Sequence, residues 1–185
     1  DFNVVDRDLN VKKLVDFKDK IKVITTFPSL DTPVCDLQVK EFNKRAVGLS
    51  SEIAVIGISK DLPFAQKRFC GAFDIDNISL LSDYKFSSFG INYGLLIKEL
   101  NLLARSAIIL DKNNVIRYFQ VAEEVTRAMN YDEVIENLEK VLILDQTPAI
   151  EGLPVKCRPC EGGALPLIGD RLEKLMSDIH GWQLV

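Results

Sequence analysis

The sequence lacks an excess of positive charge, a long hydrophobic run and the basic-then-apolar start of a signal peptide. Its 23 Lys and Arg residues against 27 Asp and Glu residues give a net charge of −4. This balance argues against nucleic acid as a partner, because affinity for a phosphate backbone comes mostly from clustered cations. The apolar stretches, such as residues 53–58, have the length of a β-strand rather than the ~20 residues of a membrane span. We therefore expect a cytoplasmic protein that binds neither nucleic acid nor a membrane.

Histidine is also scarce, with His180 alone, whereas there are four cysteines: Cys35, Cys70, Cys157 and Cys160. In a secreted domain of fewer than ~100 residues, four cysteines indicate a disulfide framework; in a larger chain without an export signal they indicate catalytic or metal chemistry. The 185 residues are 47% hydrophobic, which is enough for one full core. Because domains run to ~100–200 residues, the length allows one domain and a remnant.

Residues 1–144 alternate strand-like and helix-like segments. Continuously apolar or β-branched runs predict strands, and apolar residues at helical spacing predict helices. Gly71 is expected to end the second helix, and Asn130 with Glu133 resembles a capping box that opens the last one. Strands are expected at 21–27, 53–59, 79–81, 106–110 and 115–121, and helices at 33–49, 63–69, 86–89 and from 130 onward. This order predicts an α/β protein with a thioredoxin-like fold, a mixed central sheet with helices on both faces; other α/β sandwiches fit the same order.

Cys35 lies in the first turn of an expected helix. Thr32 is a good N-cap and Pro33 suits the first helical position, so Cys35 would be the third helical residue. Free backbone N–H groups and the positive end of the helix dipole favour a thiolate there, and the thiolate is the form that attacks peroxides and disulfides. The alternative is a buried, inert cysteine. The spacing of Pro28, Thr32 and Cys35 favours the nucleophile, because it predicts a pocket for a small polar oxidant.

Three segments resemble the bacterial thiol peroxidases of the peroxiredoxin family. Residues 28–35 read PSLDTPVC, which is similar to the family's peroxidatic loop. Residues 61–70 read DLPFAQKRFC, which is similar to the second characteristic motif, and residues 96–106 read LIKELNLLARS, which is similar to the segment that brings an arginine to the active site. The motifs follow one another in the family's order, so residues 1–144 are identified as a thiol peroxidase domain with a thioredoxin-like fold.

The resemblance implies a role for five residues. Cys35 is the peroxidatic cysteine, which a hydroperoxide oxidises to a sulfenic acid, and Cys70 is the resolving cysteine, which condenses with that sulfenic acid to an intramolecular disulfide. Thr32 orients the peroxide, Arg105 stabilises the thiolate and the charge on the departing oxygen, and Pro28 shields and shapes the pocket. The nearby second thiol protects the sulfenic acid from further oxidation. The family implies neither a cofactor nor a metal.

Two of these residues have plainer interpretations when each is taken alone. Arg105 at a strand end would be a solvated surface cation, and Cys70 would be a core cysteine packed with Phe64 and Phe69. The order of the three motifs favours the functional interpretation of both. Because Cys35 and Cys70 lie on different expected helices, we expect them to be too far apart to bond in the reduced protein, so that local unwinding must bring them together.

The resemblance also implies partners: a hydroperoxide substrate, thioredoxin as the reductant, and a second copy of the chain in a homodimer formed through the surface around the active site. Two other functions fit the residues. One is a redox sensor or disulfide-exchange protein with little peroxide turnover, and the other is a non-catalytic partner of a pterin enzyme. Thiol peroxidases usually have an N-terminal hairpin ahead of the segment that begins at Asp1; its absence from this sequence leaves one edge of the sheet in question.

The sequence changes character after residue 144. Residues 145–154 read DQTPAIEGLP, which predicts a linker because they contain two prolines and no periodicity. Residues 155–185 contain CRPCEGG and, near the end, GW, and they resemble the incomplete start of a pterin-4a-carbinolamine dehydratase, without the paired histidines of that chemistry. Three interpretations of Cys157 and Cys160 stay open: passive thiols, a second redox pair, or half of a zinc site with His180 as a further ligand.

Overall fold

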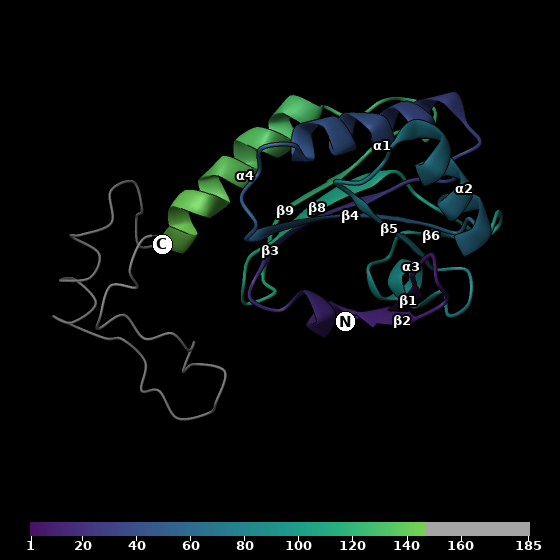
Figure 1. The fold of residues 1–185 in the computed structure, drawn as a ribbon, viewed down its shortest axis with the longest axis horizontal. Coiled ribbons are helices and arrows are strands. Elements are labelled where there is room, and N and C mark those ends of the chain that lie inside the picture. The colour runs from purple at the N-terminus through teal and green to yellow at the C-terminus, as the bar shows by residue number, and fades with distance from the viewer. Residues whose placement is uncertain (147–185) are drawn as a thin grey trace, which may run out of the picture. The chain divides into compact units, whose positions relative to one another are not determined.

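The computed structural model describes residues 1–146, which form a central sheet with helices packed against it (Figure 1). Its elements, in chain order, are β1 (Asn3–Val5), β2 (Val11–Lys13), the 3-10 helix η1 (Leu14–Phe17), β3 (Ile21–Thr26), α1 (Pro33–Ala46), β4 (Ile53–Ser59), α2 (Pro63–Phe73), β5 (Ser79–Ser82), α3 (Ser88–Asn92), β6 (Leu96–Ile97), β7 (Leu102–Leu103), β8 (Ser106–Leu110), β9 (Ile116–Val121) and α4 (Tyr131–Gln146). Helix α4 therefore continues to Gln146, and the rest of the expected linker and the dehydratase-like segment 155–185 lie outside the described residues.

The main sheet has seven strands in the order β2-β1-β5-β4-β3-β8-β9. Strand β3 pairs in parallel with β4 and antiparallel with β8, so the sheet is mixed. Every residue of β3 is buried, as are all but one of β4, because both strands lie inside the sheet and are covered on both faces. The expected thioredoxin-like fold with a mixed central sheet is confirmed.

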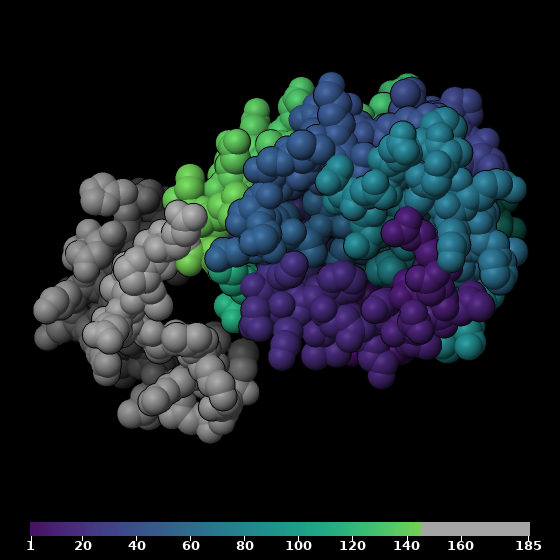
Figure 2. All heavy atoms as spheres, in the orientation of Figure 1, coloured from purple at the N-terminus to yellow at the C-terminus, as the bar shows by residue number. Residues whose placement is uncertain are grey.

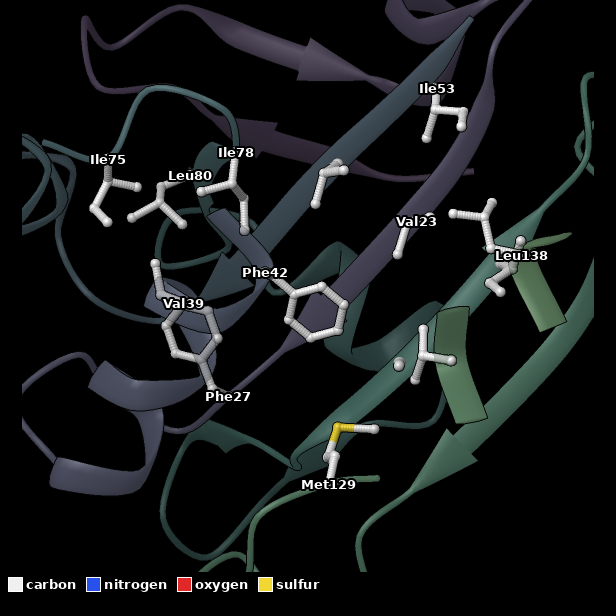
Figure 3. Close-up of a cluster of buried hydrophobic side chains, with 14 of the residues drawn as sticks. Val23, Phe27, Val39, Phe42, Ile53, Ile75, Ile78, Leu80, Met129 and Leu138 are labelled. Atoms are coloured by element: carbon white, nitrogen blue, oxygen red, sulfur yellow. The ribbon is translucent and has the colours of Figure 1, made fainter. Parts of the chain in front are cut away.

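Two hydrophobic cores lie on opposite faces of this sheet. Helices α1, α2 and α4 contribute to one core, whose side chains include Phe42, Leu138 and the strand residue Val23 (Figure 3). Helix α3 and η1 contribute to the other, through Phe89 and Leu14. The prediction of helices on both faces is therefore confirmed, and the helices that carry the two cysteines of the motifs share one face.

Helix α2 is longer than the sequence predicts, since it passes through Gly71 and ends at Phe73. A glycine inside a helix costs about 0.5–1 kcal/mol relative to alanine. The additional turn places the ring of Phe73 4.9 Å from that of Phe69, and this packing offsets the cost. Asp74, with φ of 52°, takes the left-handed conformation that ends the helix.

The chain's first residues form an antiparallel hairpin, β1–β2, that the sequence analysis did not predict. Strand β1 pairs with β5 through Val5 and Ser82, so the hairpin occupies one edge of the sheet. The purple atoms of Figure 2 mark this part of the chain on the surface of the described residues. Within residues 1–146, no helix is long and apolar enough to cross a membrane.

Candidate active site

The first turn of α1 holds Cys35 as the sequence predicts. Thr32 has an extended backbone at the N-cap position, Pro33 is the first helical residue, and the Asp36 N–H donates to the Thr32 carbonyl at 3.0 Å. Cys35 is thus the third helical residue, and it is fully buried. The Thr32 hydroxyl does not cap the helix; it donates to the carbonyl of Ser29 at 3.1 Å.

Arg105 brings a positive charge to Cys35 from the residue just before β8. Its side chain is 1% exposed, so the interpretation as a solvated surface cation is wrong. Its Nη2 donates to the Cys35 Sγ at 3.3 Å, across 70 residues of sequence. The guanidinium therefore lies within hydrogen-bond distance of the sulfur that the sequence analysis took as the nucleophile.

The other partners of the Arg105 guanidinium are neutral oxygen atoms. Nε and Nη2 donate to the Val125 carbonyl at 3.1 and 2.6 Å, and Nη1 donates to Gln38 Oε1. A buried cation is costly without an opposite charge. Among the hydrogen-bond partners of this guanidinium, the Cys35 sulfur is the one that belongs to an ionisable side chain.

Gln38 is a site residue that the sequence analysis missed. It lies one turn after Cys35 on the buried stripe of α1, fully enclosed. Its Nε2 donates to Thr25 Oγ1 at 2.5 Å and to the Thr26 carbonyl at 3.1 Å, which leaves Oε1 to accept from Arg105. Strand β3 therefore orients the amide, and the amide orients the guanidinium. A polar residue on an otherwise apolar helical stripe was the available signal.

Asp61, also missed, ties the loop before α1 to the second motif. Its carboxylate accepts from Ser29 Oγ at 2.7 Å, the Leu30 N–H at 2.9 Å and Ser59 Oγ at 2.8 Å. Within this loop Pro28 is buried, whereas Thr32 is exposed. The second motif thus fixes the segment between β3 and α1.

Cys70 lies in α2, 3% exposed, and belongs to the same apolar cluster as Cys35. Both are free thiols. Burial raises the pKa of the Cys70 thiol; Arg7, which hydrogen-bonds to it, lowers the pKa, and the Asp76 carboxylate raises it further. Cys70 is therefore a protonated thiol at neutral pH. Phe69 packs in the same cluster, whereas Phe64 is 64% exposed and does not.

A groove of about 460 Å³ opens between the start of α1 and α2. Its size is within the usual range for small-molecule sites. It is lined by Leu30, Asp31, Thr32, Pro33, Asp36, Ala65, Arg68, Phe69, Ala72 and Phe73. The groove therefore touches both helices that carry a cysteine, although neither Cys35 nor Cys70 is among its lining residues. Two thiols can undergo a two-electron oxidation to a disulfide once they come within bonding distance.

Comparisons with known proteins agree on one family. The Redoxin family model matches residues 1–135. Thiol peroxidases of Oceanobacillus iheyensis and Bacillus subtilis are 44% and 46% identical over 140 and 136 residues, which are 76% and 74% of this chain and 85% and 81% of theirs. The crystal structure of a peroxiredoxin-like protein from Aquifex aeolicus superposes with a TM-score of 0.71 at 40% identity, over 76% of this chain and 82% of that one. The family match ends before residue 155, so it gives no support to the dehydratase-like segment.

Proposed function

Because the chain belongs to the redoxin family and is a thiol peroxidase, an oxidoreductase of the peroxiredoxin type, we propose that Cys35 reduces hydrogen peroxide and alkyl hydroperoxides and that Cys70 completes the cycle. The observation that carries the proposal is the 3.3 Å contact between Arg105 Nη2 and Cys35 Sγ in the first turn of α1. A guanidinium beside a cysteine favours a thiolate in general, which supports Cys35 as the nucleophile, and burial raises the pKa of the Cys70 thiol, which supports Cys70 as the thiol that reacts second.

In the first step the Cys35 thiolate attacks one peroxide oxygen, the O–O bond breaks, and the second oxygen leaves as water or an alcohol after taking a proton. Arg105 offers its guanidinium to the charge that develops on the leaving oxygen. Since the Thr32 hydroxyl donates its own hydrogen to Ser29, its oxygen is left to accept a hydrogen bond from the peroxide. Pro28 is buried within the same loop, and we propose that it shapes the pocket by fixing the course of the loop.

In the second step Cys70 attacks the Cys35 sulfenic acid, an S–S bond forms, and water leaves. Both cysteines are buried on separate helices, which supports a step in which the first turn of α1 and the part of α2 around Cys70 unwind to meet. A dithiol must then reduce the disulfide by thiol–disulfide exchange. We propose thioredoxin for this role, in the cytoplasm, where such reductants keep thiols reduced, with the enzyme acting as a homodimer.

Intact-mass analysis after one equivalent of hydrogen peroxide tests this mechanism. We expect the loss of two hydrogens, mapped by peptide analysis to Cys35 and Cys70, and no such product in the Cys35→Ser variant. In the Cys70→Ser variant we expect the gain of one oxygen on Cys35. Sustained peroxide consumption with catalytic thioredoxin separates an enzyme from a redox sensor, because a sensor would stop after one oxidation. A disulfide that joins Cys35 or Cys70 to a different cysteine, in place of the Cys35–Cys70 bond, would refute the mechanism.

A further inference from the structure

Lys40 connects the two helices that carry Cys35 and Cys70. Its ammonium lies over the Phe73 ring of α2, with Nζ 3.5 Å from the ring centroid, and 5.9 Å from the centroid of Phe69. The same Nζ pairs with Asp36, one turn earlier on α1, at 2.7 and 2.9 Å from the two carboxylate oxygens. One ammonium therefore contacts both helices at once.

The partners of Lys40 flank the two cysteines. Asp36 directly follows Cys35 in the first turn of α1, and Phe69 and Phe73 lie on either side of Cys70 in α2, with their rings 4.9 Å apart. These are the segments that must unwind before Cys70 can reach the Cys35 sulfenic acid. Unwinding of α2 withdraws the rings from the ammonium, and unwinding of α1 withdraws the carboxylate.

We propose that Lys40 is a positioning residue that holds α2 against α1 and so sets how quickly Cys70 reaches oxidised Cys35. This inference rests on the proposed function, because it concerns the step after the first oxidation. An ammonium is attracted electrostatically to the face of an aromatic ring, and the attraction becomes stronger when the pair is shielded from water. The Lys40 side chain is 35% exposed, so the contact is partly desolvated.

The rate of unwinding decides between two fates of the sulfenic acid. If Cys70 arrives first, the sulfenic acid and the thiol give a disulfide and water. If a second hydroperoxide arrives first, it transfers one oxygen to the sulfur, leaves as water or an alcohol, and gives a sulfinic acid that thiols do not reduce. By slowing the unwinding, Lys40 makes Cys35 more sensitive to excess peroxide.

The Lys40→Gln variant tests this by removing the charge. We expect it to need about fivefold more hydrogen peroxide than the unchanged protein for half of Cys35 to become sulfinic acid, the factor that an ordinary cation–π contact supplies. Intact-mass analysis separates the disulfide, which loses two hydrogens, from the sulfinic acid, which gains two oxygens. The rate of the first oxidation, followed in a Cys70→Ser background, should change by less than about twofold, since Lys40 acts after that step.

Arg45 provides a matched control on the same helix. It pairs with Glu41 one turn earlier at 2.6 Å and with Asp132 of α4 at 2.7 Å, and its Cζ lies 5.9 Å from the centroid of the Tyr131 ring, which also belongs to α4. Arg45→Gln therefore removes a similar contact without touching α2. We expect this variant to need as much hydrogen peroxide as the unchanged protein for half of Cys35 to become sulfinic acid. Lys40→Arg keeps the cation and should stay close to the unchanged protein. Phe73→Leu removes the ring and should act like Lys40→Gln, with the double variant no more resistant than either single one.

Three results would overturn the inference. An unchanged partition in Lys40→Gln, with disulfide still forming between Cys35 and Cys70, would refute it and leave the proposed function standing. If Lys40→Gln slowed the first oxidation by as large a factor as it changed the ratio of disulfide to sulfinic acid, Lys40 would act on the Cys35 sulfur instead. Failure of the unchanged protein to form the disulfide at all would refute the proposed function and this inference together.

Discussion

Gln38 holds the guanidinium that contacts Cys35, and the sulfur itself accepts its hydrogen bond from Arg105. Its amide has one acceptor and one donor end, and both are used: Oε1 accepts from Arg105, and Nε2 donates to Thr25 and Thr26. If the amide were rotated by 180°, its NH₂ donors would face the N–H donors of the guanidinium, and no hydrogen bond could form between them. Strand β3 therefore fixes the direction in which Arg105 offers its charge.

Replacing Gln38 with methionine should uncouple Arg105 from β3. We expect the rate of reaction with hydrogen peroxide to fall between about 10- and 100-fold, because small displacements of a charge-stabilising donor are costly. Leaving Arg105 Nη1 without its partner should also lower the free energy of unfolding by about 1–3 kcal/mol. Stopped-flow oxidation and urea denaturation measure the two effects. Lys44→Met, an exposed change on the same helix, is the control; an unchanged oxidation rate in Gln38→Met would contradict the expectation.

Because of Cys70, the free energy of unfolding should change with pH in the alkaline range. Burial raises its pKa in the folded protein, so above the ordinary thiol pKa the unfolded chain releases a proton that the folded protein keeps. The contribution of Cys70 to stability is then fully present below the unfolded pKa and is lost as pH rises through the folded one. We expect the difference in unfolding free energy between the unchanged protein and Cys70→Ala, both reduced, to shrink as pH rises above about 8.5.

Other groups also have a raised pKa in the folded protein, so the effect of Cys70 must be isolated by comparison with Cys70→Ala. Burial also raises the pKa of Tyr93 and Tyr131, and burial together with Glu133 raises that of Tyr118 to about 12. These contributions are common to both proteins and cancel in the difference. In Arg7→Gln, which removes the charge that lowers the Cys70 pKa, the difference from the matching Arg7→Gln and Cys70→Ala double variant should begin to shrink at the same pH but keep shrinking to a higher pH; a pH-independent difference would contradict the assignment.

At the scale of single residues, the sequence predicts what depends on near neighbours. The position of Cys35 in the helix follows from Thr32 and Pro33, which are local, and the structure agrees. Gln38 and Asp61 act on partners 67 and 32 residues away, Arg105 and Ser29, and no spacing within a motif reveals such pairs. Arg105 itself was found only through the resemblance to a family.

The loop between β3 and α1 is held in place by hydrogen bonds to the carboxylate of Asp61, which is distant in the sequence. Asp61→Ala should remove three hydrogen bonds from Ser29, Leu30 and Ser59 and lower the free energy of unfolding by about 2 kcal/mol. Because the loop ends at Thr32, we also expect slower oxidation by hydrogen peroxide. Denaturation curves and stopped-flow kinetics measure both. Asp31→Asn, an exposed carboxylate of the same loop, should change stability by less than about 0.5 kcal/mol; equal effects of the two variants would exclude an anchoring role.

The elements that the sequence predicted well are those with a strong pattern. The buried strands β3, β4 and β8 read as apolar runs, and α4 begins where Asn130 accepts from the Glu133 N–H at 3.2 Å. Strands β1 and β2 have three residues each, too few to show a period. The end of α2 was wrong because Gly71 was weighed by local preference alone, whereas the packing of Phe69 and Phe73 keeps the helix going.

At the scale of residues 1–146, Cys35 and Cys70 lie in the apolar cluster that also joins α1, α2 and α4 to the sheet. The proposed disulfide between them would therefore disturb the packing of one face, while the second core, on the other face, contains neither Cys35 nor Cys70. The proposed reaction would thus need a protein that is rigid on one side of the sheet and can open locally on the other.

Hydrogen exchange should display this asymmetry. In the oxidised protein we expect faster amide exchange in the first turn of α1 and in α2 around Cys70, because backbone hydrogen bonds open there, and unchanged protection in β3, β4 and β8, where the ladders stay paired. The Cys70→Ser variant treated with one equivalent of peroxide is the control: its Cys35 is oxidised without a disulfide, so α2 should stay protected. Equal protection of α2 in the reduced and disulfide forms would mean that the cysteines meet without unwinding. Faster exchange across β3 and β4 as well would mean that oxidation loosens the whole sheet rather than one face.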